Sequence, residues 1–562
     1  MDLSKAPFNL DETGIKWVTD TLATMDADDK LGQLFCQLTY SDDDEYLADL
    51  AKNKRVGGVM LRNMPVGEAS RAVTTLQTST RIPMLIAANL EAGVTQTIPE
   101  GTHTGALMAI GATGDPKTAA TAAKVIAAEA MSVGINWSFG PVIDLDLNYR
   151  NPIVATRAFG GDTDLVAQMG AEYVTAMEAA GMATSIKHWP GDGVDDRDQH
   201  LLNSVNTMTV EEWDATFRKV YQASIDAGAR TVMAGHIMLP EYSKALCPGL
   251  ADKDVLPGLV AKELLNDLLR GSLGFNGLVV TDATTMSGMA QVLPRKDAVP
   301  ATIAAGCDMF LFTKNFDEDY GYMREGIANG TITPERLDEA ITRILALKAS
   351  LGLHLCDNLP AANAAELLRT PEHVAVARDI AARSVTLVKE EAGVLPITPE
   401  RYKRVLFYGL EGDGWGYGIS GEGILDGFME RLREAGHEVT KFEPAEGWEG
   451  RTIPTTDVTD NYDLIVYLAN LSVKSNQTCV RIVWKEPMGA DVPEFITTTP
   501  TVFISVENPY HLLDVPRVRT FINTYNSSPY VFDHLMAALC GEAEFQGTAP
   551  TDPFLGRWDT RL

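Results

Sequence analysis

The chain has 562 residues, of which 45% are apolar and 22% charged, an ordinary globular balance that excludes a disordered, collagen-like or disulfide-scaffold protein. Its 76 acidic and 47 basic residues give a formal charge of −29. A field of this sign repels nucleic acid and anionic lipid, so neither nucleic acid nor a membrane is expected as a partner.

Eight short apolar segments in the first two-thirds of the chain are predicted to be β-strands. They are residues 35–40, 56–62, 84–88, 135–140, 183–188, 231–236, 277–282 and 307–312. Most are nearly continuous apolar runs, as expected for strands that helices cover on both faces. Eight such units predict an α/β fold with a (β/α)₈ TIM-like barrel over residues 1–355, although an open doubly wound sheet has the same strand count.

A second block of strands follows the helical segment 335–353. Residues 356–375 are predicted to be a linker, because proline, asparagine and alanine interrupt the helical pattern there. The predicted strands of the second block are 404–409, 438–442, 463–469, 501–506 and 529–533. They predict a smaller α/β sandwich domain with a mainly parallel sheet over residues 376–562. The Gly-rich stretch 412–418 is interpreted as a surface loop, with a sugar-contacting loop as the alternative.

The N-terminal segment, the lengths of the apolar runs and the cysteines predict where in the cell the protein is located. The N-terminal segment lacks a basic stretch followed by an apolar one, so we expect no secretory signal. No apolar run approaches the roughly 20 residues that span a bilayer. The six cysteines are scattered without a CxxC pair, as in a reducing compartment. These features predict a cytoplasmic protein.

The loop after the predicted strand 183–188 carries an aspartate and a histidine two residues apart. In an extended loop this spacing places the side chains of Asp198 and His200 on one side, where the carboxylate can orient the imidazole. The alternatives are a solvated acidic loop or a cation site that uses Asp195, Asp196 and Asp198.

Two other strand ends carry polar side chains. Asp282 ends the strand 277–282 and could be either a nucleophile facing the pocket or the N-cap of the next helix. His236 ends the strand 231–236 and could face the pocket or lie in the core. Carboxyl ends of barrel strands are where active sites are built, so both are candidate site residues.

Several long segments, in the correct order, resemble glycoside hydrolase family 3. They read INWSFGPVIDLDLNYRNPIVATRAFGGD, KHWPGDG, LLRGSLGFNGLVVTDATTM, SVENPYHLLDVP and LCGEAEFQGTAP. Asp282 is followed by Ala283 and not by tryptophan, and Asp198-Gln199-His200 matches the D[ST]H of the β-N-acetylglucosaminidase-like subgroup. That subgroup also includes β-glycoside phosphorylases.

The resemblance implies roles for individual residues. Asp282 is the nucleophile, His200 is the acid/base, and Asp198 holds His200. The implied substrate-binding residues are Lys187, His188, Arg157, His236, Asn89 and Met286. No cofactor and no metal is implied, and the family suggests a homodimer.

Four positions depart from the subgroup's pattern. Asn89 and Thr97 replace an aspartate and an arginine of the sugar-binding rim, Asp192 replaces the histidine of PGHG, and Gln199 replaces serine or threonine. These changes leave open whether the sugar is glucose or N-acetylglucosamine.

We expect a retaining β-glycoside phosphorylase that transfers a β-linked glucosyl or N-acetylglucosaminyl unit to inorganic phosphate. The alternative is a retaining exo-β-N-acetylglucosaminidase or β-glucosidase that uses water. Two other classes are less favoured: a metal-dependent barrel hydrolase using His188, Asp198, His200 and His236, and a sugar-binding protein without catalysis.

Overall fold

The computed structural model describes residues 1–391, 393–412, 423–443, 454–472, 475–478 and 481–562. Residues 413–418 of the Gly-rich stretch and Cys479 lie outside these ranges. Contacts divide the chain into two compact units. The first comprises residues 1–104, 116–145 and 163–374, and the second comprises residues 105–115, 146–162 and 375–562. Two short segments of the N-terminal half therefore belong to the second unit.

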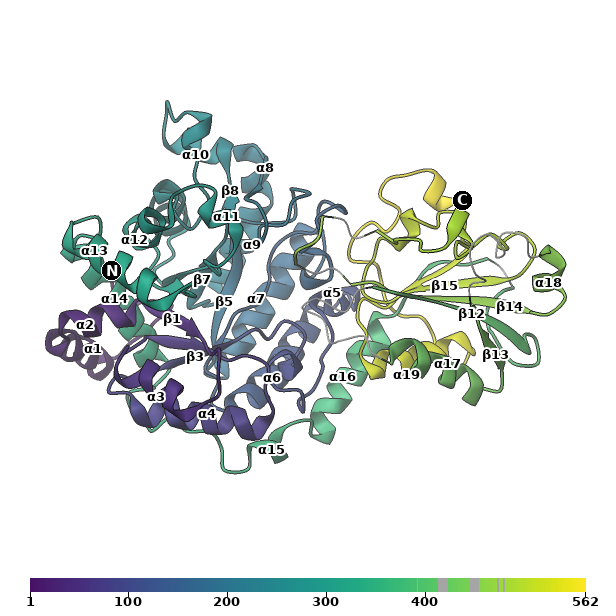
Figure 1. Ribbon diagram of the computed structural model, residues 1–562, viewed down its shortest axis with the longest axis horizontal. Helices are drawn as coiled ribbons and strands as arrows, with labels where there is room; N and C mark the ends of the chain where they lie inside the picture. Colours follow the sequence, from purple (N-terminus) through teal and green to yellow (C-terminus); the bar gives the residue numbers. More distant parts are fainter. Residues whose placement is uncertain (392, 413–422, 444–453, 473–474, 479–480) are drawn as a thin grey trace. The chain divides into compact units, whose positions relative to one another are not determined.

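The first unit is built on a ring of eight parallel strands (Figure 1). They are β1 (Phe35–Leu38), β2 (Gly58–Met60), β3 (Leu85–Ala88), β4 (Trp137–Ser138), β5 (Ala183–Trp189), β7 (Thr231–Ala234), β9 (Leu278–Thr281) and β10 (Phe310–Leu311). Their order is β10-β1-β2-β3-β4-β5-β7-β9, and a parallel bridge from Val280 to Met309 closes the ring. The predicted barrel is confirmed, and the open sheet is excluded.

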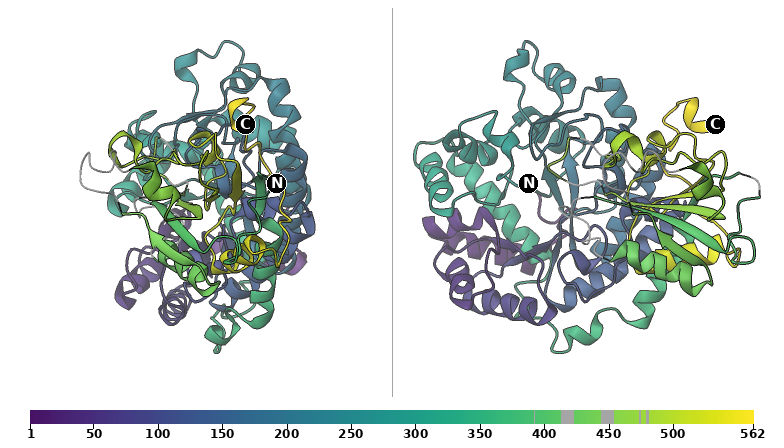
Figure 2. Two further views of the ribbon diagram at one scale, coloured as in Figure 1. Left: turned by 90° about the vertical axis from the view of Figure 1, so that its right-hand side faces the viewer. Right: turned by 45° about the vertical axis from the view of Figure 1, so that its right-hand side comes forward.

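Helices surround these strands (Figure 2). They are α1 (Glu12–Thr24), α2 (Ala27–Gln33), α3 (Asp44–Lys52), α4 (Val66–Ser79), α6 (Pro116–Ser132), α7 (Thr163–Ala179), α8 (Val210–Ala215), α9 (Phe217–Asp226), α10 (Pro240–Leu246), η4 (Glu263–Ser272), α11 (Ser287–Ala290), α12 (Arg295–Ala305), α13 (Phe316–Ala328), α14 (Pro334–Ser350) and α15 (Ala364–Leu367). Residues at the start of α14 favour helix formation there. The Thr333 side chain accepts from Arg336 N as an N-cap, and Pro334 occupies the first turn.

A two-stranded parallel sheet lies beyond the barrel strands. Its members are β6 (Ser204–Val205) and β8 (Ile237–Met238). It joins the loop that follows β5 to the segment that follows β7. The loop predicted to carry the Asp–His pair is thus fixed at its far end to the neighbouring strand's continuation.

The second unit contains a six-stranded sheet in the order β11-β16-β15-β14-β12-β13. The strands are β11 (Thr386–Lys389), β12 (Arg404–Glu411), β13 (Glu438–Lys441), β14 (Leu464–Asn470), β15 (Thr501–Ser505) and β16 (Thr520–Asn523). Only β11 runs antiparallel to its neighbour, so the predicted mainly parallel sheet is confirmed.

An aromatic row crosses four adjacent strands of this sheet. Tyr408, Tyr467, Phe503 and Phe521 are aligned in register and stack with ring centroids 4.3, 5.6 and 5.3 Å apart. Successive side chains of a strand alternate between faces, so these rings fill one side of the sheet. The row is the centre of this unit's hydrophobic core.

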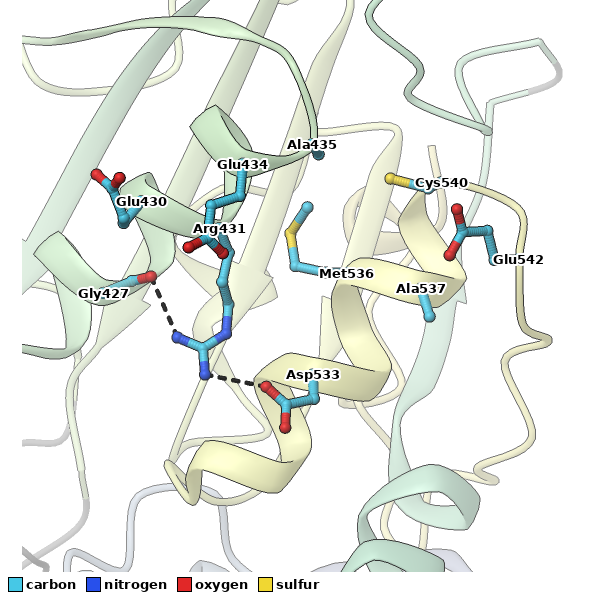
Figure 3. A pocket seen from close by; sticks show the side chains of 10 residues that line it. All are labelled: Gly427, Glu430, Arg431, Glu434, Ala435, Asp533, Met536, Ala537, Cys540 and Glu542. Carbon is cyan, nitrogen blue, oxygen red and sulfur yellow. Dashed lines mark hydrogen bonds and ion pairs between the residues drawn. The ribbon is translucent and has the colours of Figure 1, made fainter.

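The helices of the second unit are α5 (Leu107–Ala112), α17 (Ile424–Glu434), α18 (Thr455–Thr459) and α19 (Pro529–Leu539), while α16 (Pro371–Ser384) begins in the first unit and continues into the second. Figure 3 shows how Arg431 of α17 donates to the carbonyl of Gly427 (3.2 Å) and pairs with Asp533 of α19 (3.0 Å). This pair lines an open hollow of about 700 Å³ between the two helices.

The prediction of a strand over residues 529–533 was wrong, because this segment is the first turn of α19. Ser528 precedes the helix and Pro529 starts it, with its fixed φ and missing N–H suited to a first turn. The apolar positions continue at helical spacing to Leu535 and Leu539. A short apolar run alone does not distinguish strand from helix. The four-residue strands β11 and β16 were not predicted.

Short 3₁₀ turns complete both units. They are η1 (Val94–Gln96), η2 (Ala155–Arg157), η3 (Asp252–Asp254), η6 (Pro487–Gly489), η7 (His511–Leu513) and η8 (Asp559–Arg561). Within the described ranges, no helix has the length and apolar character needed to span a bilayer.

Candidate active site

Asp282 follows β9 directly and lies at the carboxyl end of the barrel. Its backbone N donates to the carbonyl of Ala234 on β7 (2.7 Å), and its Oδ1 accepts from Ala283 N (2.7 Å). The side chain is buried, and Oδ2 has no hydrogen-bond partner among the described residues. One carboxylate oxygen is therefore held in place while the other is available for reaction.

Three histidines surround this carboxylate. Burial by itself raises the pKa of Asp282, but nearby His188, His236 and His200 outweigh burial and hold its pKa below the ordinary value. His188 lies on β5 and His200 in the loop after it, whereas His236 follows β7. Asp282 is thus an ionised carboxylate in a buried site, which is the state required of a nucleophile.

His200 is oriented by Asp198. The Nδ1 of His200 lies 2.7 Å from Asp198 Oδ1, and the backbone N of His200 donates to the same oxygen (2.9 Å). The Asp198 side chain is fully buried and that of His200 is 11% exposed. A carboxylate at Nδ1 keeps the proton on that nitrogen and leaves Nε2 to exchange protons with a substrate.

The loop that carries His200 is attached to the segment after Asp282. The carbonyl of His200 accepts from Ser287 N (3.1 Å), and Asn203 Nδ2 donates to the carbonyl of Gly288 (3.0 Å). Gln291 Nε2 donates to the carbonyl of Leu201 (3.0 Å). These contacts place the Asp198–His200 pair at the mouth of the barrel beside the strand that supplies the nucleophile.

His188 has a carboxylate partner that sequence reasoning missed. Asp144, which follows β4, accepts from His188 Nδ1 (2.6 Å) and from His188 N (3.0 Å). Asp144 is fully buried. The available signal was an aspartate four residues after the end of the predicted strand 135–140, in the segment PVID.

Lys187 is held by two residues of the loop after β3. Its Nζ pairs with Glu91 Oε1 (2.7 Å) and lies 3.4 Å from Asn89 Oδ1. Thr97, which replaces the subgroup's arginine, donates through Oγ1 to the carbonyl of Asn89 (3.3 Å). Glu91 was not among the predicted site residues, so this ion pair is a finding of the structure.

His236 contacts the nucleophile's own loop. Its Nε2 lies 3.1 Å from the carbonyl of Ala283, and its Nδ1 has no partner in the part of the chain that the structure describes. Burial lowers the pKa of His236, and the charge of Asp282 acts in the opposite direction. Met286, partly buried, precedes α11, and its N donates to the carbonyl of Ala283 (3.1 Å).

Arg157 belongs to the second unit, where its Nη1 donates to the carbonyl of Ile153 (3.2 Å). The structure therefore assembles all predicted site residues except Arg157 within the first unit. In the described ranges, no group of three or more His, Cys, Asp or Glu side chains is arranged to hold a metal ion. The roles of the assembled residues remain predictions.

The carboxyl end of this barrel holds a buried carboxylate and a carboxylate-bound imidazole, which can supply a nucleophile and a proton donor. The family model described as "Glycosyl hydrolase family 3 N terminal domain" matches residues 26–347. The chain belongs to glycoside hydrolase family 3 and is an enzyme acting on O-glycosidic bonds.

Relatives cover the whole chain. A "Beta-N-acetylglucosaminidase/beta-glucosidase" of Cellulomonas fimi is 63% identical over 563 residues, covering 100% of both chains. A solved "Beta-glucoside phosphorylase BglX" is 38% identical with a TM-score of 0.93, covering 100% of this chain and 99% of its own. A family 3 beta-N-acetylglucosaminidase from Paenibacillus sp. str. FPU-7 shares the fold at 24% identity, with a TM-score of 0.79 and coverage of 94% and 99%.

Proposed function

We propose that this protein is a retaining β-glycoside phosphorylase that transfers a glucosyl or N-acetylglucosaminyl unit to inorganic phosphate. The observation that carries the proposal is the carboxylate-bound imidazole of His200 beside the ionised Asp282. The likeness to a β-glucoside phosphorylase along the full chain supports phosphate as the acceptor. The name of the Cellulomonas fimi relative supports both sugars.

The first step forms a covalent glycosyl-enzyme. Asp282 Oδ2 attacks carbon 1 of the sugar while the bond from carbon 1 to the leaving oxygen breaks. His200 gives its Nε2 proton to that oxygen, and Asp198 stabilises the imidazolium before the transfer. The products of this step are the free alcohol and an ester between Asp282 and the sugar, with His200 neutral.

In the second step an oxygen of dihydrogen phosphate attacks carbon 1, the bond to Asp282 breaks, and His200 Nε2 takes the proton of that phosphate oxygen, which restores the imidazolium. A carboxylate acid/base would be an anion at this stage and would repel the incoming phosphate. Two unit charges about 4 Å apart repel by roughly 4 kcal/mol at an effective dielectric of ~20. Neutral His200 places no charge directly beside the incoming phosphate, because the negative charge of Asp198 lies on the far side of the imidazole, at Nδ1. The predicted cytoplasmic location would supply abundant phosphate.

The sugar is selected at the rim that departs from the subgroup's pattern. Asn89 and Thr97 contact each other where the subgroup has an aspartate and an arginine, so a charged pair is replaced by neutral groups. Neutral groups bind sugar hydroxyls without requiring a particular charge partner. We infer that both glucosides and N-acetylglucosaminides enter the site.

Glycoside cleavage measured with and without millimolar phosphate tests the acceptor. We expect phosphate to accelerate turnover and the product to be a sugar 1-phosphate of retained β configuration, detected by phosphorus NMR. An unchanged rate with free sugar as the only product would establish the water-using hydrolase instead.

A further inference from the structure

Gln199, which lies between the two members of the Asp198–His200 pair, is fully buried and bonded at both ends of its amide. Its Oε1 accepts from the backbone N of His236 (3.0 Å), and its Nε2 donates to Asp192 Oδ2 (3.0 Å). The amide therefore spans the ends of two neighbouring barrel strands, β5 and β7.

Asp192 is itself fixed by the strand ends. Its backbone N donates to Asp144 Oδ1 (2.8 Å), and its own Oδ1 accepts from Gly193 N (2.7 Å) and Ser204 Oγ (3.3 Å). Asp192 is 1% exposed. Asp144 also holds His188, so the contacts run without a break from β4 to the loop of His200.

Residues 192 and 199 both differ from the subgroup's pattern, and the two differences complement each other. Serine or threonine at position 199 has too short a side chain to reach both partners, and the glutamine donor requires an acceptor, which Asp192 supplies. Space for the amide depends on Gly235, where an added Cβ would lie 2.9 Å from Gln199 Oε1.

We infer that Gln199 is a positioning residue that holds His200 ready for proton transfer above Asp282, acting through Asp192 and the backbone of His236. The inference rests on the proposed acid/base role of His200. A buried amide with both ends bonded reduces the number of conformations open to the loop. A proton donor misplaced by about 1 Å can cost on the order of 10²-fold in rate.

A charge-swap experiment tests this contact. Gln199→Glu places a second carboxylate against Asp192, and adding Asp192→Asn restores one donor between the two side chains. We compare kcat/KM, which reports formation of the glycosyl-enzyme, on a 2,4-dinitrophenyl and a phenyl β-glucoside. Gln199→Glu is expected to lose about 10- to 100-fold on the phenyl substrate and less than about 3-fold on the dinitrophenyl one, whose leaving group needs no proton.

The double variant Gln199→Glu/Asp192→Asn is expected to recover most of the loss on the phenyl substrate. Gln222→Glu is the matched control, because Gln222 donates to Asp226 (2.9 Å) in a similar contact on the exposed face of α9. It should leave both substrates unchanged. Where Gln199→Glu does not fold, Gln199→Ala removes the two bonds without adding charge and provides the same leaving-group comparison.

Equal losses on both substrates, no loss, or no recovery in the double variant would overturn the inference. His200→Ala separates this failure from failure of the proposed function. If His200→Ala loses activity equally on both substrates, the acid/base assignment itself is wrong. If its loss depends on the leaving group while Gln199→Glu resembles the unmodified enzyme, only the positioning role of Gln199 is wrong.

Discussion

At the scale of single residues, the chemistry depends on carboxylates whose environments differ. Asp282 keeps one oxygen without a hydrogen-bond partner among the described residues and is held ionised by three imidazoles, whereas Asp198 orients His200, and Asp144 accepts from both His188 and Asp192 N. Identical side chains therefore take different roles because their neighbours differ.

Sequence reasoning selected Asp282, Asp198 and His200 because each lies within a local motif. It did not identify the partners of Asp144 and Glu91, because their contacts join strand ends that lie far apart in the chain. Contacts of that kind are set by barrel closure and not by local spacing.

Asp144 is expected to be essential for the placement of His188. Asp144→Asn removes the charge and places an amide N–H donor at one of the two carboxylate positions, so the His188 imidazole loses its charged acceptor or must change tautomer. A charge-assisted hydrogen bond contributes about 1.5–3 kcal/mol, which corresponds to a loss of roughly 10- to 100-fold in kcat/KM. Steady-state kinetics on an aryl β-glucoside measure this loss. A change of less than about 2-fold would contradict the assigned contact.

At the scale of elements, strands and helices follow from different signals. Continuous apolar runs located all eight barrel strands, because strands buried on both faces need no polar alternation. The same signal failed at residues 529–533, where a proline-initiated helix begins with three apolar residues. It also missed β16, whose four residues are too few to show a periodic pattern of apolar residues.

Helix α14 carries a buried lysine that is expected to destabilise the barrel as the pH falls toward 7. Burial lowers the pKa of Lys348 from 10.5 to about 7, and its Nζ contacts Gln33 Oε1 (2.5 Å). The folded state thus loses a proton that the unfolded chain keeps, so this group's contribution to stability falls as the pH drops from about 10.5 to about 7. The cost is bounded at about 5 kcal/mol.

Lys348→Met is therefore predicted to raise the unfolding temperature at pH 7, with a gain that shrinks toward pH 10. Thermal unfolding across this range measures the effect. A gain that does not change with pH would show that packing, and not the lysine's charge, accounts for it.

At the scale of the whole molecule, the two units do not follow the order of the sequence. Residues 105–115 and 146–162 leave the barrel segment and belong to the second unit. Composition and periodicity predicted a boundary near residue 375, but they do not indicate that two earlier segments belong to the second unit. Arg157 illustrates the consequence, since it belongs to the second unit and its bond to the carbonyl of Ile153 lies within that unit.

The segment 146–162 contributes a titrating group to the second unit. Asp146 accepts from Tyr510 Oη (2.5 Å), and burial, partly opposed by bonds to Tyr510 and Thr551, raises the pKa of Asp146 to about 7. The folded state keeps this proton while the unfolded chain releases it near pH 3.8. Stability from this group is therefore present at low pH and lost as the pH rises through 7.

Asp146→Asn is expected to stabilise the protein at pH 8 by no more than about 4 kcal/mol, with a smaller gain at pH 5. Asparagine keeps an acceptor for Tyr510 and carries no charge. Thermal unfolding at the two pH values measures the difference. A larger gain at pH 5 than at pH 8 would contradict the raised pKa.

The proposed mechanism requires a covalent bond between carbon 1 of the sugar and Asp282. The most direct measurement is incubation with a 2-deoxy-2-fluoro-β-glucosyl substrate bearing a good leaving group, followed by proteolysis and mass spectrometry. We expect one added fluoroglucosyl unit on the peptide that contains Asp282, and its release as a sugar 1-phosphate when phosphate is added. A label on any other carboxylate, or inactivation without a label, would contradict it.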